Sequence, residues 1–182
     1  MIKKLSASLA TVLLATGCGV DIPQGYRPSQ STVPNASITE ISIDQRTEPI
    51  EISGPGLSGG EITTEDMSGI VVVNAWASWC PPCREEWSIF AEIQSEFPDI
   101  DILGLNEADD KAAALEFLNS QEGSWPHISD PNQAIAAKAD VIQGSYLPGT
   151  IVLDKQHRVA AKFIGPVNKS DLQRIIQELL AE

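Results

Sequence analysis

Cysteine is scarce in this chain of 182 residues, which has it only at positions 18, 80 and 83. An odd number of cysteines leaves one without a partner in any set of intramolecular disulfides. If Cys18 has a separate use, Cys80 and Cys83 remain as one pair, and no cysteine is left for a structural disulfide elsewhere. The folded part of the chain must then be held together by its hydrophobic core.

Basic residues are also few, with 12 Lys and Arg against 25 Asp and Glu. Without residues 1–17, which contain two lysines and no acid, the balance is 10 to 25 and the formal charge is −15. Nucleic acids and anionic lipid headgroups repel a protein of this charge. The composition therefore predicts no nucleic-acid partner, and surface charge does not predict membrane binding.

The apolar run near the start of the chain, from Leu5 to Ala15, is too short to span a bilayer as a mature helix. It follows two lysines, Lys3 and Lys4, as the apolar part of an export signal does. It ends in Leu-Ala-Thr-Gly-Cys, which resembles a bacterial lipobox, with Ala15 where leucine is commoner. The resemblance implies cleavage before Cys18 and a lipid on that cysteine. The alternative is an ordinary secretory signal that leaves Cys18 unmodified.

We expect three regions along the chain. Residues 1–17 are the predicted lipoprotein signal peptide. Residues 18–42 are rich in Pro, Ser, Thr and Gln, a composition typical of a flexible tether. Residues 43–182 have an ordinary length for one domain with one core. The lipid would hold this domain at the outer face of the bacterial cytoplasmic membrane.

The most informative stretch of the domain is Trp79-Cys80-Pro81-Pro82-Cys83. Residues 70–76 before it are apolar and largely β-branched, as expected of a buried parallel strand. Two consecutive prolines are tolerated only in the first turn of a helix, and an apolar stripe then continues to residue 97. Cys80 is therefore predicted at a helix N-terminus, where free amides and the helix dipole favour a thiolate. The pattern indicates a reactive dithiol.

The remaining patterns give the order of the elements. They predict a β-hairpin from residues 48–53 and 61–63, a strand at 99–106, helices at 109–121 and 131–139, an antiparallel pair at 150–154 and 158–164, and a closing helix from about residue 170. This order predicts an α/β fold, a thioredoxin-like three-layer α/β/α sandwich with an N-terminal β-hairpin and a helical insert.

From residue 43 onward the chain resembles the TlpA/ResA branch of extracytoplasmic thiol-disulfide oxidoreductases. The resemblance rests on residues 73–86, Val-Asn-Ala-Trp-Ala-Ser-Trp-Cys-Pro-Pro-Cys-Arg-Glu-Glu. It implies an enzyme whose only redox group is the cysteine pair, with protein disulfides or thiols as substrates. Such proteins mostly reduce disulfides, for example in cytochrome c maturation, and a membrane electron-transfer protein recharges them. The alternative within this class is a disulfide-forming oxidant.

We expect Cys80 to be the nucleophile, as the cysteine nearer to solvent, and Cys83 to resolve the mixed disulfide. Trp79, Pro81 and Pro82 are predicted to border the dithiol and contact the substrate.

The resemblance places a cis-proline at Pro148, with the backbone of Leu147 presented to an incoming peptide. Gly149 stands where threonine is more often seen. The resemblance also implies that Glu86, three residues after Cys83, tunes the dithiol; its alternative is a solvated helix charge. Trp87 takes the place of a position near which relatives have a proline, so we expect a helix without the usual kink.

A metal-binding module is the main alternative of another class. Cys80 and Cys83 could supply half of a zinc site with His127 and His157, or bind copper(I). No second pair of ligands has suitable spacing, and the two prolines favour a tight dithiol. No metal site is therefore predicted. A peroxidase of the same fold would have its peroxide-attacking cysteine elsewhere.

Overall fold

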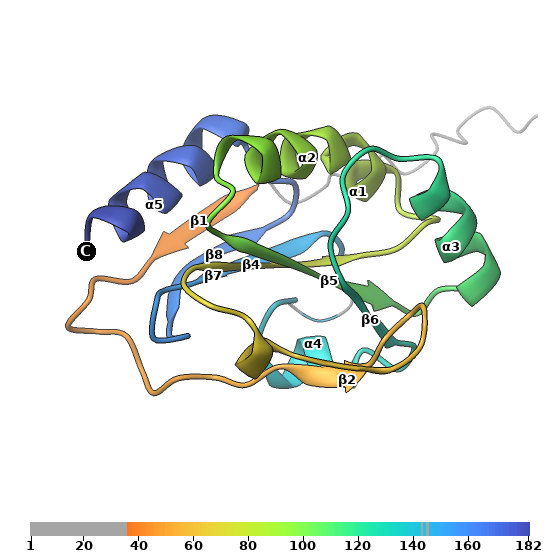
Figure 1. Ribbon diagram of the computed structural model, residues 1–182, viewed down its shortest axis with the longest axis horizontal. Coiled ribbons are helices and arrows are strands. Elements are labelled where there is room, and N and C mark those ends of the chain that lie inside the picture. The colour runs from red at the N-terminus through yellow and green to blue at the C-terminus, as the bar shows by residue number, and fades with distance from the viewer. Residues whose placement is uncertain (1–35, 143, 145) are drawn as a thin grey trace, which may run out of the picture. The chain divides into compact units, whose positions relative to one another are not determined.

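The computed structural model describes residues 36–182 except 143 and 145 (Figure 1). The predicted signal peptide, the predicted lipidation site Cys18 and most of the predicted tether lie outside the described residues. Among the described residues, no helix is long and apolar enough to cross a membrane.

A six-stranded sheet forms the middle layer, in the order β1-β8-β7-β4-β5-β6. The strand β4 pairs in parallel with β5 and antiparallel with β7, so it lies near the centre of the sheet. All six residues of β4 are buried, because both faces of the sheet are covered. The strands are β1 (Ser37–Glu40), β4 (Val71–Trp76), β5 (Asp101–Glu107), β6 (His127–Asp130), β7 (Gly149–Leu153) and β8 (Val159–Ile164).

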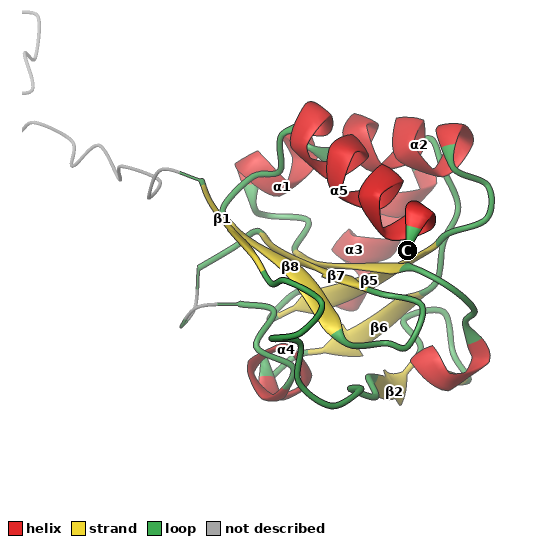
Figure 2. Ribbon diagram, turned by 90° about the vertical axis from the view of Figure 1, so that its left-hand side faces the viewer, coloured by secondary structure: helices red, strands yellow, loops and turns green. Residues whose placement is uncertain are grey.

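Helices lie on both sides of this sheet. Figure 2 shows α2 and α5 over one face, and α4 with β2 over the other. The helices are α1 (Pro81–Glu85), α2 (Trp87–Glu96), α3 (Lys111–Asn119), α4 (Ala134–Lys138) and α5 (Lys169–Ala181), with a 3-10 turn at Thr64–Asp66. The predicted three-layer α/β/α arrangement is confirmed, and α3 is the helix predicted after the second buried strand; the strand β6 that follows it was not predicted.

The two faces of the sheet bury separate apolar clusters. Strand residues alternate between faces, so Val72 packs with Phe90 of α2 and Ile176 of α5, whereas Val73 packs with Ala136 of α4. A third cluster at the end of β4 surrounds the dithiol and joins Trp76, Trp87, Ala114 and Phe117 to both cysteines. This third cluster positions the site.

Two expectations about the start of the domain need correction. Residues 37–40, predicted as tether, form the edge strand β1, which pairs antiparallel with β8. All four residues of β1 are exposed, so their side chains carry no buried pattern that the sequence could reveal. The predicted hairpin exists, but its first strand is β2 (Ser53–Pro55) rather than residues 48–53, and it pairs with β3 (Glu61–Thr63).

Candidate active site

The cysteine pair lies where β4 gives way to α1, as the sequence predicts. Cys80 is the N-cap of α1, Pro81 and Pro82 occupy its first turn, and Cys83 follows within the same helix. The two cysteines form a disulfide with a Cα–Cα distance of 5.3 Å. Cys80 is 3% exposed and Cys83 2% exposed, so exposure in this oxidised form does not distinguish a nucleophile. The two cysteines differ in their place in the helix: Cys80 caps α1, and its Sγ accepts a hydrogen bond from the Cys83 N–H at 3.3 Å.

The turn before Cys80 is held from both sides. The carboxylate of Asp109, just after β5, accepts hydrogen bonds from the Ser78 N–H at 2.6 Å and the Ser78 hydroxyl at 2.8 Å. On the other side, the Arg84 guanidinium donates to the Ser78 carbonyl at 3.2 Å. Trp79, which is 57% exposed, donates its indole N–H to the Ala108 carbonyl at 3.1 Å. Trp79 therefore lies beside the dithiol with a fixed orientation.

Glu86 lies in the protein interior, 3% exposed, at the C-terminal end of α1. Its carboxylate accepts one hydrogen bond from the Asn74 side-chain amide at 3.0 Å and one from the Val167 N–H at 2.9 Å. The same Asn74 nitrogen donates to the Thr150 hydroxyl at 3.0 Å. Burial raises the pKa of Glu86 to about 8, although both hydrogen bonds act in the opposite direction. Because Glu86 is buried, the alternative that it is merely a solvent-exposed charge on the helix surface is excluded.

The helix after Cys83 is interrupted at Glu86, so the expectation of a helix without a kink is wrong. The segment divides into α1 and α2. Glu86 is both the C-cap of α1 and the N-cap of α2. No proline is needed, because side chains fix the two halves separately. Glu86 is held by Asn74 and Val167, while the Trp87 indole packs on Trp76 and donates to the Glu122 carbonyl.

The Leu147–Pro148 peptide bond is cis, as predicted. Pro148 is buried and immediately precedes β7, whose first residue Gly149 pairs with Ala75 at the end of β4. The Pro148 carbonyl accepts a hydrogen bond from the Gly165 N–H at 3.0 Å. Leu147 is half-buried against the cluster that contains both cysteines. A Cβ atom at Gly149 would collide with the Val141 carbonyl oxygen, which explains why threonine is absent here.

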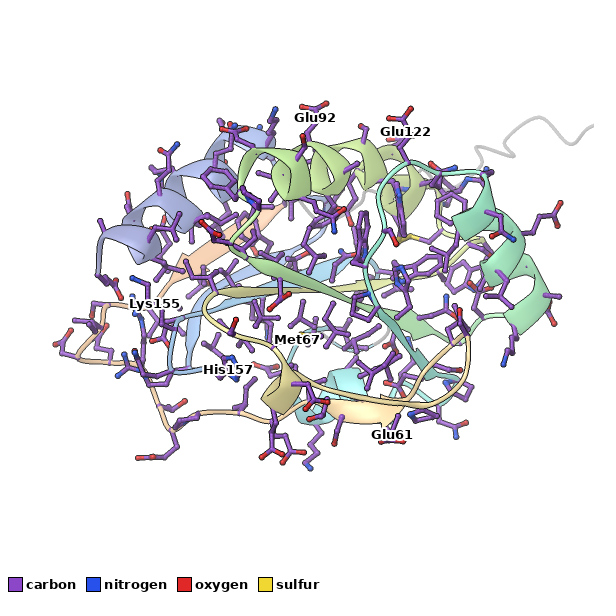
Figure 3. The ribbon with its side chains drawn as sticks, in the orientation of Figure 1. Glu61, Met67, Glu92, Glu122, Lys155 and His157 are labelled. Carbon is purple, nitrogen blue, oxygen red and sulfur yellow. A yellow bond between two sulfur atoms is a disulfide. The ribbon has the colours of Figure 1, made fainter. Side chains whose placement is uncertain are left out.

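The two histidines do not join the cysteines in a metal site. His127 lies in β6, where its Nδ1 accepts a hydrogen bond from the Trp76 indole at 3.2 Å, and burial lowers its pKa to about 3. His157 lies in the turn between β7 and β8, and Figure 3 shows it beside Lys155. That turn follows Leu153, which pairs with the first residue of β4, whereas the dithiol follows the last. No cluster of three or more metal-binding side chains occurs among the residues described.

One buried acid near the site was not anticipated from the sequence. Glu107, the last residue of β5, is fully buried, and neither of its oxygens accepts a hydrogen bond from a donor in the described part of the chain, which leaves the Asp130 carboxylate as its polar neighbour. It pairs in register with Asp130 of β6, whose carboxylate accepts from three backbone N–H groups at the start of α4. Burial, together with the Asp130 carboxylate, raises the pKa of Glu107 to about 9. Its position after an apolar strand gave no signal that the side chain turns inward.

Comparison with known proteins agrees with this geometry. Residues 46–162 match the AhpC/TSA family. The chain belongs to that family. The thiol:disulfide interchange protein DsbE homolog of Paracoccus denitrificans is 34% identical over 129 residues, which cover 68% of each chain. The thiol-disulfide oxidoreductase ResA of Bacillus cereus is 27% identical over 130 residues, 68% of this chain and 71% of that one.

A solved structure gives the same answer for the fold. The DsbF homologue from Corynebacterium diphtheriae superimposes with a TM-score of 0.73 at 34% identity, covering 84% of this chain and 96% of the other. The predicted thioredoxin-like fold and the predicted resemblance to ResA-type proteins are confirmed. This AhpC/TSA-family member is a thiol-disulfide oxidoreductase with the pair Cys80–Cys83.

Proposed function

We propose that this oxidoreductase reduces protein disulfides outside the cytoplasm while anchored to the membrane by a lipid on Cys18. The proposal takes its chemistry from the site and its location from the signal-like segment before Cys18. The observation that carries it is the cysteine pair at the start of α1, with Trp79 before it and Leu147, the residue before the cis-proline, packed against the cluster that contains both cysteines. The −15 charge of the chain after residue 17 leaves the lipid as the means of attachment.

The proposed reaction has two exchange steps. The Cys80 thiolate attacks a substrate disulfide, so that one substrate sulfur leaves as a thiolate and a mixed disulfide forms. The Cys83 thiol then loses its proton and attacks Cys80 Sγ, which releases the second substrate thiolate and leaves the Cys80–Cys83 disulfide. Two electrons pass to the substrate, whose two thiolates are protonated.

Residues around the pair have proposed parts in these steps. Glu86 lies at the end of the same short helix as Cys83, and its pKa of about 8 suits a group that takes up a proton near neutral pH. Trp79, Pro81 and Pro82 form the proposed substrate surface on the helix side of the pair. The Leu147 backbone forms it on the other side, where a substrate peptide would pair as an added strand.

Regeneration requires a second partner, since each turnover oxidises the pair. We propose a membrane electron-transfer protein that returns two electrons, and clients such as the cysteines of proteins that mature outside the cell, cytochromes c among them. This follows from the resemblance to ResA-type relatives rather than from any contact in the structure.

The reduction potential of Cys80–Cys83, measured by equilibration in dithiothreitol or glutathione buffers, tests the direction. We expect a value near that of thioredoxin, about −270 mV. A value near that of DsbA, about −120 mV, would instead make the protein a disulfide-forming oxidant. Mass spectrometry of the exported protein tests the anchor, since diacyl modification of Cys18 adds the mass of its lipid.

A further inference from the structure

Arg84 extends from α1 toward the turn that carries Cys80. Its backbone N–H donates to the Cys80 carbonyl at 3.2 Å, and residues four apart in a helix have their side chains on the same face. Helical side chains lean toward the N-terminus of their helix, and Arg84 does so, because its guanidinium donates to the Ser78 carbonyl at 3.2 Å. The guanidinium therefore lies at the turn that leads into the cysteine pair.

Two contacts fix the orientation of this guanidinium. One edge donates to Ser78, and the guanidinium carbon lies 5.0 Å from the centroid of the Phe117 ring, a cation–π distance. Phe117 packs in the cluster that contains both cysteines, so Arg84 is joined to the same support as the dithiol. A guanidinium has five N–H donors, and in the described part of the chain only the Ser78 carbonyl accepts from them. The other donors are thus left for water or for a ligand.

Arg84 differs from the other arginines that the structure describes in having no acidic partner among the described residues. Arg46, Arg158 and Arg174 each make at least one salt bridge, whereas none joins Arg84 to a carboxylate of this part of the chain. An unpaired arginine is unexpected here, because acidic residues outnumber basic ones by 25 to 12. Arg84 therefore supplies, next to the cysteine pair, a cation with which a substrate can pair.

Arg84 lines a surface cleft of about 450 Å³ beside the cysteine pair, together with Ser78, Trp79, Pro81 and Glu85. Trp79 is exposed, and the hydrogen bond from its indole to the Ala108 carbonyl fixes it as an apolar wall of this cleft. A substrate sulfur joined to Cys80 brings its neighbouring residues to the cleft, since Trp79 and Pro81 flank Cys80 in the chain. Consecutive Cα atoms are about 3.8 Å apart, so a side chain one or two residues from the substrate cysteine lies within reach of the guanidinium.

Two carboxylates lie near this cation, and neither neutralises it. The Asp109 carboxylate is already occupied by the Ser78 N–H and hydroxyl and by the Asn106 amide. Glu85 follows Arg84 in α1 and lines the same cleft, but its side chain is exposed and its charge is screened by solvent. Successive helix residues point about 100° apart, so Glu85 does not stack on Arg84 as a residue four positions away would. The positive charge of the cleft is therefore on the face of α1 that Arg84 shares with Cys80.

We propose that Arg84 is a specificity-determining residue, whose guanidinium binds the side-chain carboxylate of an aspartate or glutamate one or two residues from the reacting cysteine of a protein substrate. Trp79 covers the aliphatic part of that side chain. The ion pair favours acidic cysteine sites locally, although the chain after residue 17, with its charge of −15, repels acidic proteins at long range. The inference rests on the proposed function in one respect, since it names the substrates of the same dithiol. It needs only disulfide exchange, and neither the lipid anchor nor a direction of electron flow.

Activated peptides measure this preference directly. Each peptide has blocked ends and a single cysteine among alanines, joined in a mixed disulfide to 2-thiopyridine, with Glu, Gln or Lys one or two residues before or after the cysteine. The Cys80 thiolate attacks the peptide sulfur, and pyridine-2-thione leaves with the bonding electron pair and takes up a proton. Cys83 then attacks Cys80 and releases the peptide thiolate. The rate of thione release is recorded with the reduced full chain carrying Cys18→Ser, in which Cys80 and Cys83 are the only thiols.

With Arg84 in place we expect the Glu peptide to react about two- to fivefold faster than the Gln peptide at one or more of these positions, as an exposed ion pair predicts, and the Lys peptide to react slowest. Salt at about 1 M should bring the three rates closer together, because its screening length is about 3 Å. Arg84→Gln should give the Glu and Gln peptides equal rates. Arg84→Lys should keep part of the preference, because it retains the charge but not the planar fork of donors.

Lys138→Gln is the matched control. It removes the same charge from an exposed position of α4, on the opposite face of the sheet from α2 (Figure 2), and it should keep the preference. Equal rates for the three peptides at every position with Arg84 in place, or the same preference in Arg84→Gln, would overturn the inference. If Arg84→Gln slowed all peptides by one factor, Arg84 would act on the Cys80 thiolate rather than on the substrate, and the inference would also be overturned.

The outcome is separable from that of the proposed function. Each comparison is a ratio of rates within one variant, so a smaller folded fraction lowers all rates alike and cancels. A reduction potential near that of DsbA would reverse the direction of electron flow and leave the peptide preference as measured. Loss of the preference, with a potential near that of thioredoxin, would overturn only the acidic substrate class and leave the proposed reductase standing.

Discussion

The Glu86 carboxylate accepts a hydrogen bond from the backbone N–H of Val167, 81 positions later in the chain, at 2.9 Å. Val167 is buried in the connection between β8 and α5, two residues after Gly165, which donates to the Pro148 carbonyl. A single short connection therefore contacts both the residue that ends the helix with the cysteines and the cis-proline that precedes β7. Glu86 therefore holds neighbouring elements of the site together, and its carboxyl, with a pKa of about 8, can also gain or lose a proton there.

We expect Glu86→Gln to remove an inflection near pH 8 from the pH profile of cysteine reactivity. The wild-type carboxyl has a pKa raised to about 8 by burial, so its ionisation changes the charge beside Cys83 in that range. Glutamine keeps the size and can still accept a hydrogen bond, but it does not titrate. The measurement is the rate of alkylation of the reduced pair between pH 5 and 10.

Glu85→Gln is the matched control, because Glu85 is exposed and its neighbour in sequence is buried. It should leave the profile unaltered. An identical profile for wild type and Glu86→Gln would show that Glu86 only supports the structure.

We expect Glu107→Leu to stabilise the protein in mildly alkaline solution. The pKa of Glu107 is about 9 in the folded state and near 4.5 when unfolded, so the folded state binds more protons between these values. Stability must then fall as pH rises through this window, at up to about 1.4 kcal/mol per pH unit for a single group. At about pH 9 and above the Glu107 carboxyl ionises in the interior beside the Asp130 carboxylate, so replacing it by an apolar side chain of similar size should gain about 1–3 kcal/mol there.

Urea denaturation at pH 6, 7, 8 and 9 checks this prediction. Glu86 contributes a slope of the same sign up to about pH 8, so the variant should show a shallower pH dependence than wild type from pH 6 to 8 and little dependence between pH 8 and 9. The exposed Glu116→Gln serves as control and should keep the wild-type dependence. A variant that is less stable than wild type at every pH would contradict the prediction.

The sequence alone predicts the layers of the fold and the cysteine pair at the centre of the site. Buried strands such as β4 and amphipathic helices such as α5 carry a periodic pattern, and the prolines between the cysteines allow only a helix start. The exposed edge strand β1 has no such pattern, since backbone pairing alone holds it. The strand β6 was missed because only four residues form it, and its His127 packs beside Gly104, a contact between distant positions.

Contacts between distant positions account for the other omissions at the site. Glu107 differs from exposed glutamates only in its place at the end of a buried strand, opposite Asp130. The Asp109 carboxylate accepts a hydrogen bond from the Ser78 N–H, 31 positions earlier. Neither the residue types nor their spacing in the sequence predicts this hydrogen bond. Glu86 was found through resemblance to known proteins, and its partners Asn74 and Val167 became visible only in the fold.

We expect Asp109→Ala to slow disulfide exchange as well as to reduce stability. The Asp109 carboxylate accepts three hydrogen bonds, two from Ser78 and one from the Asn106 amide at 2.9 Å. Removing it leaves these donors without their acceptor, at a cost of about 1–3 kcal/mol. The turn that carries Trp79 and Cys80 then loses its fixed position, so the rate of insulin reduction should fall at a temperature where the variant remains folded.

The neighbouring residue supplies the control for that experiment. Asp110 caps α3 by accepting from the Ala113 N–H at 3.0 Å, and its replacement by alanine should cost about 0.5–2 kcal/mol. Asp110→Ala is therefore also destabilising, but it does not touch the turn before Cys80. Equal exchange rates in the two variants would mean that Asp109 acts on stability alone.

We expect Arg46→Ala to destabilise the protein by about 1–3 kcal/mol, because it removes donors from the buried Asp154 and from the Ile41 carbonyl. Asp154 keeps its contacts with Arg158, which is why the loss stays below that of an isolated buried charge. Arg174→Ala, which breaks exposed pairs with Glu40 and Glu178, should cost only about 0–1 kcal/mol. Urea denaturation compares the two. If Arg174→Ala lowered the free energy of unfolding as much as Arg46→Ala, the prediction would be wrong. The segment around β1 would then be held as firmly by Arg174 as by the salt bridge from Arg46 to Asp154.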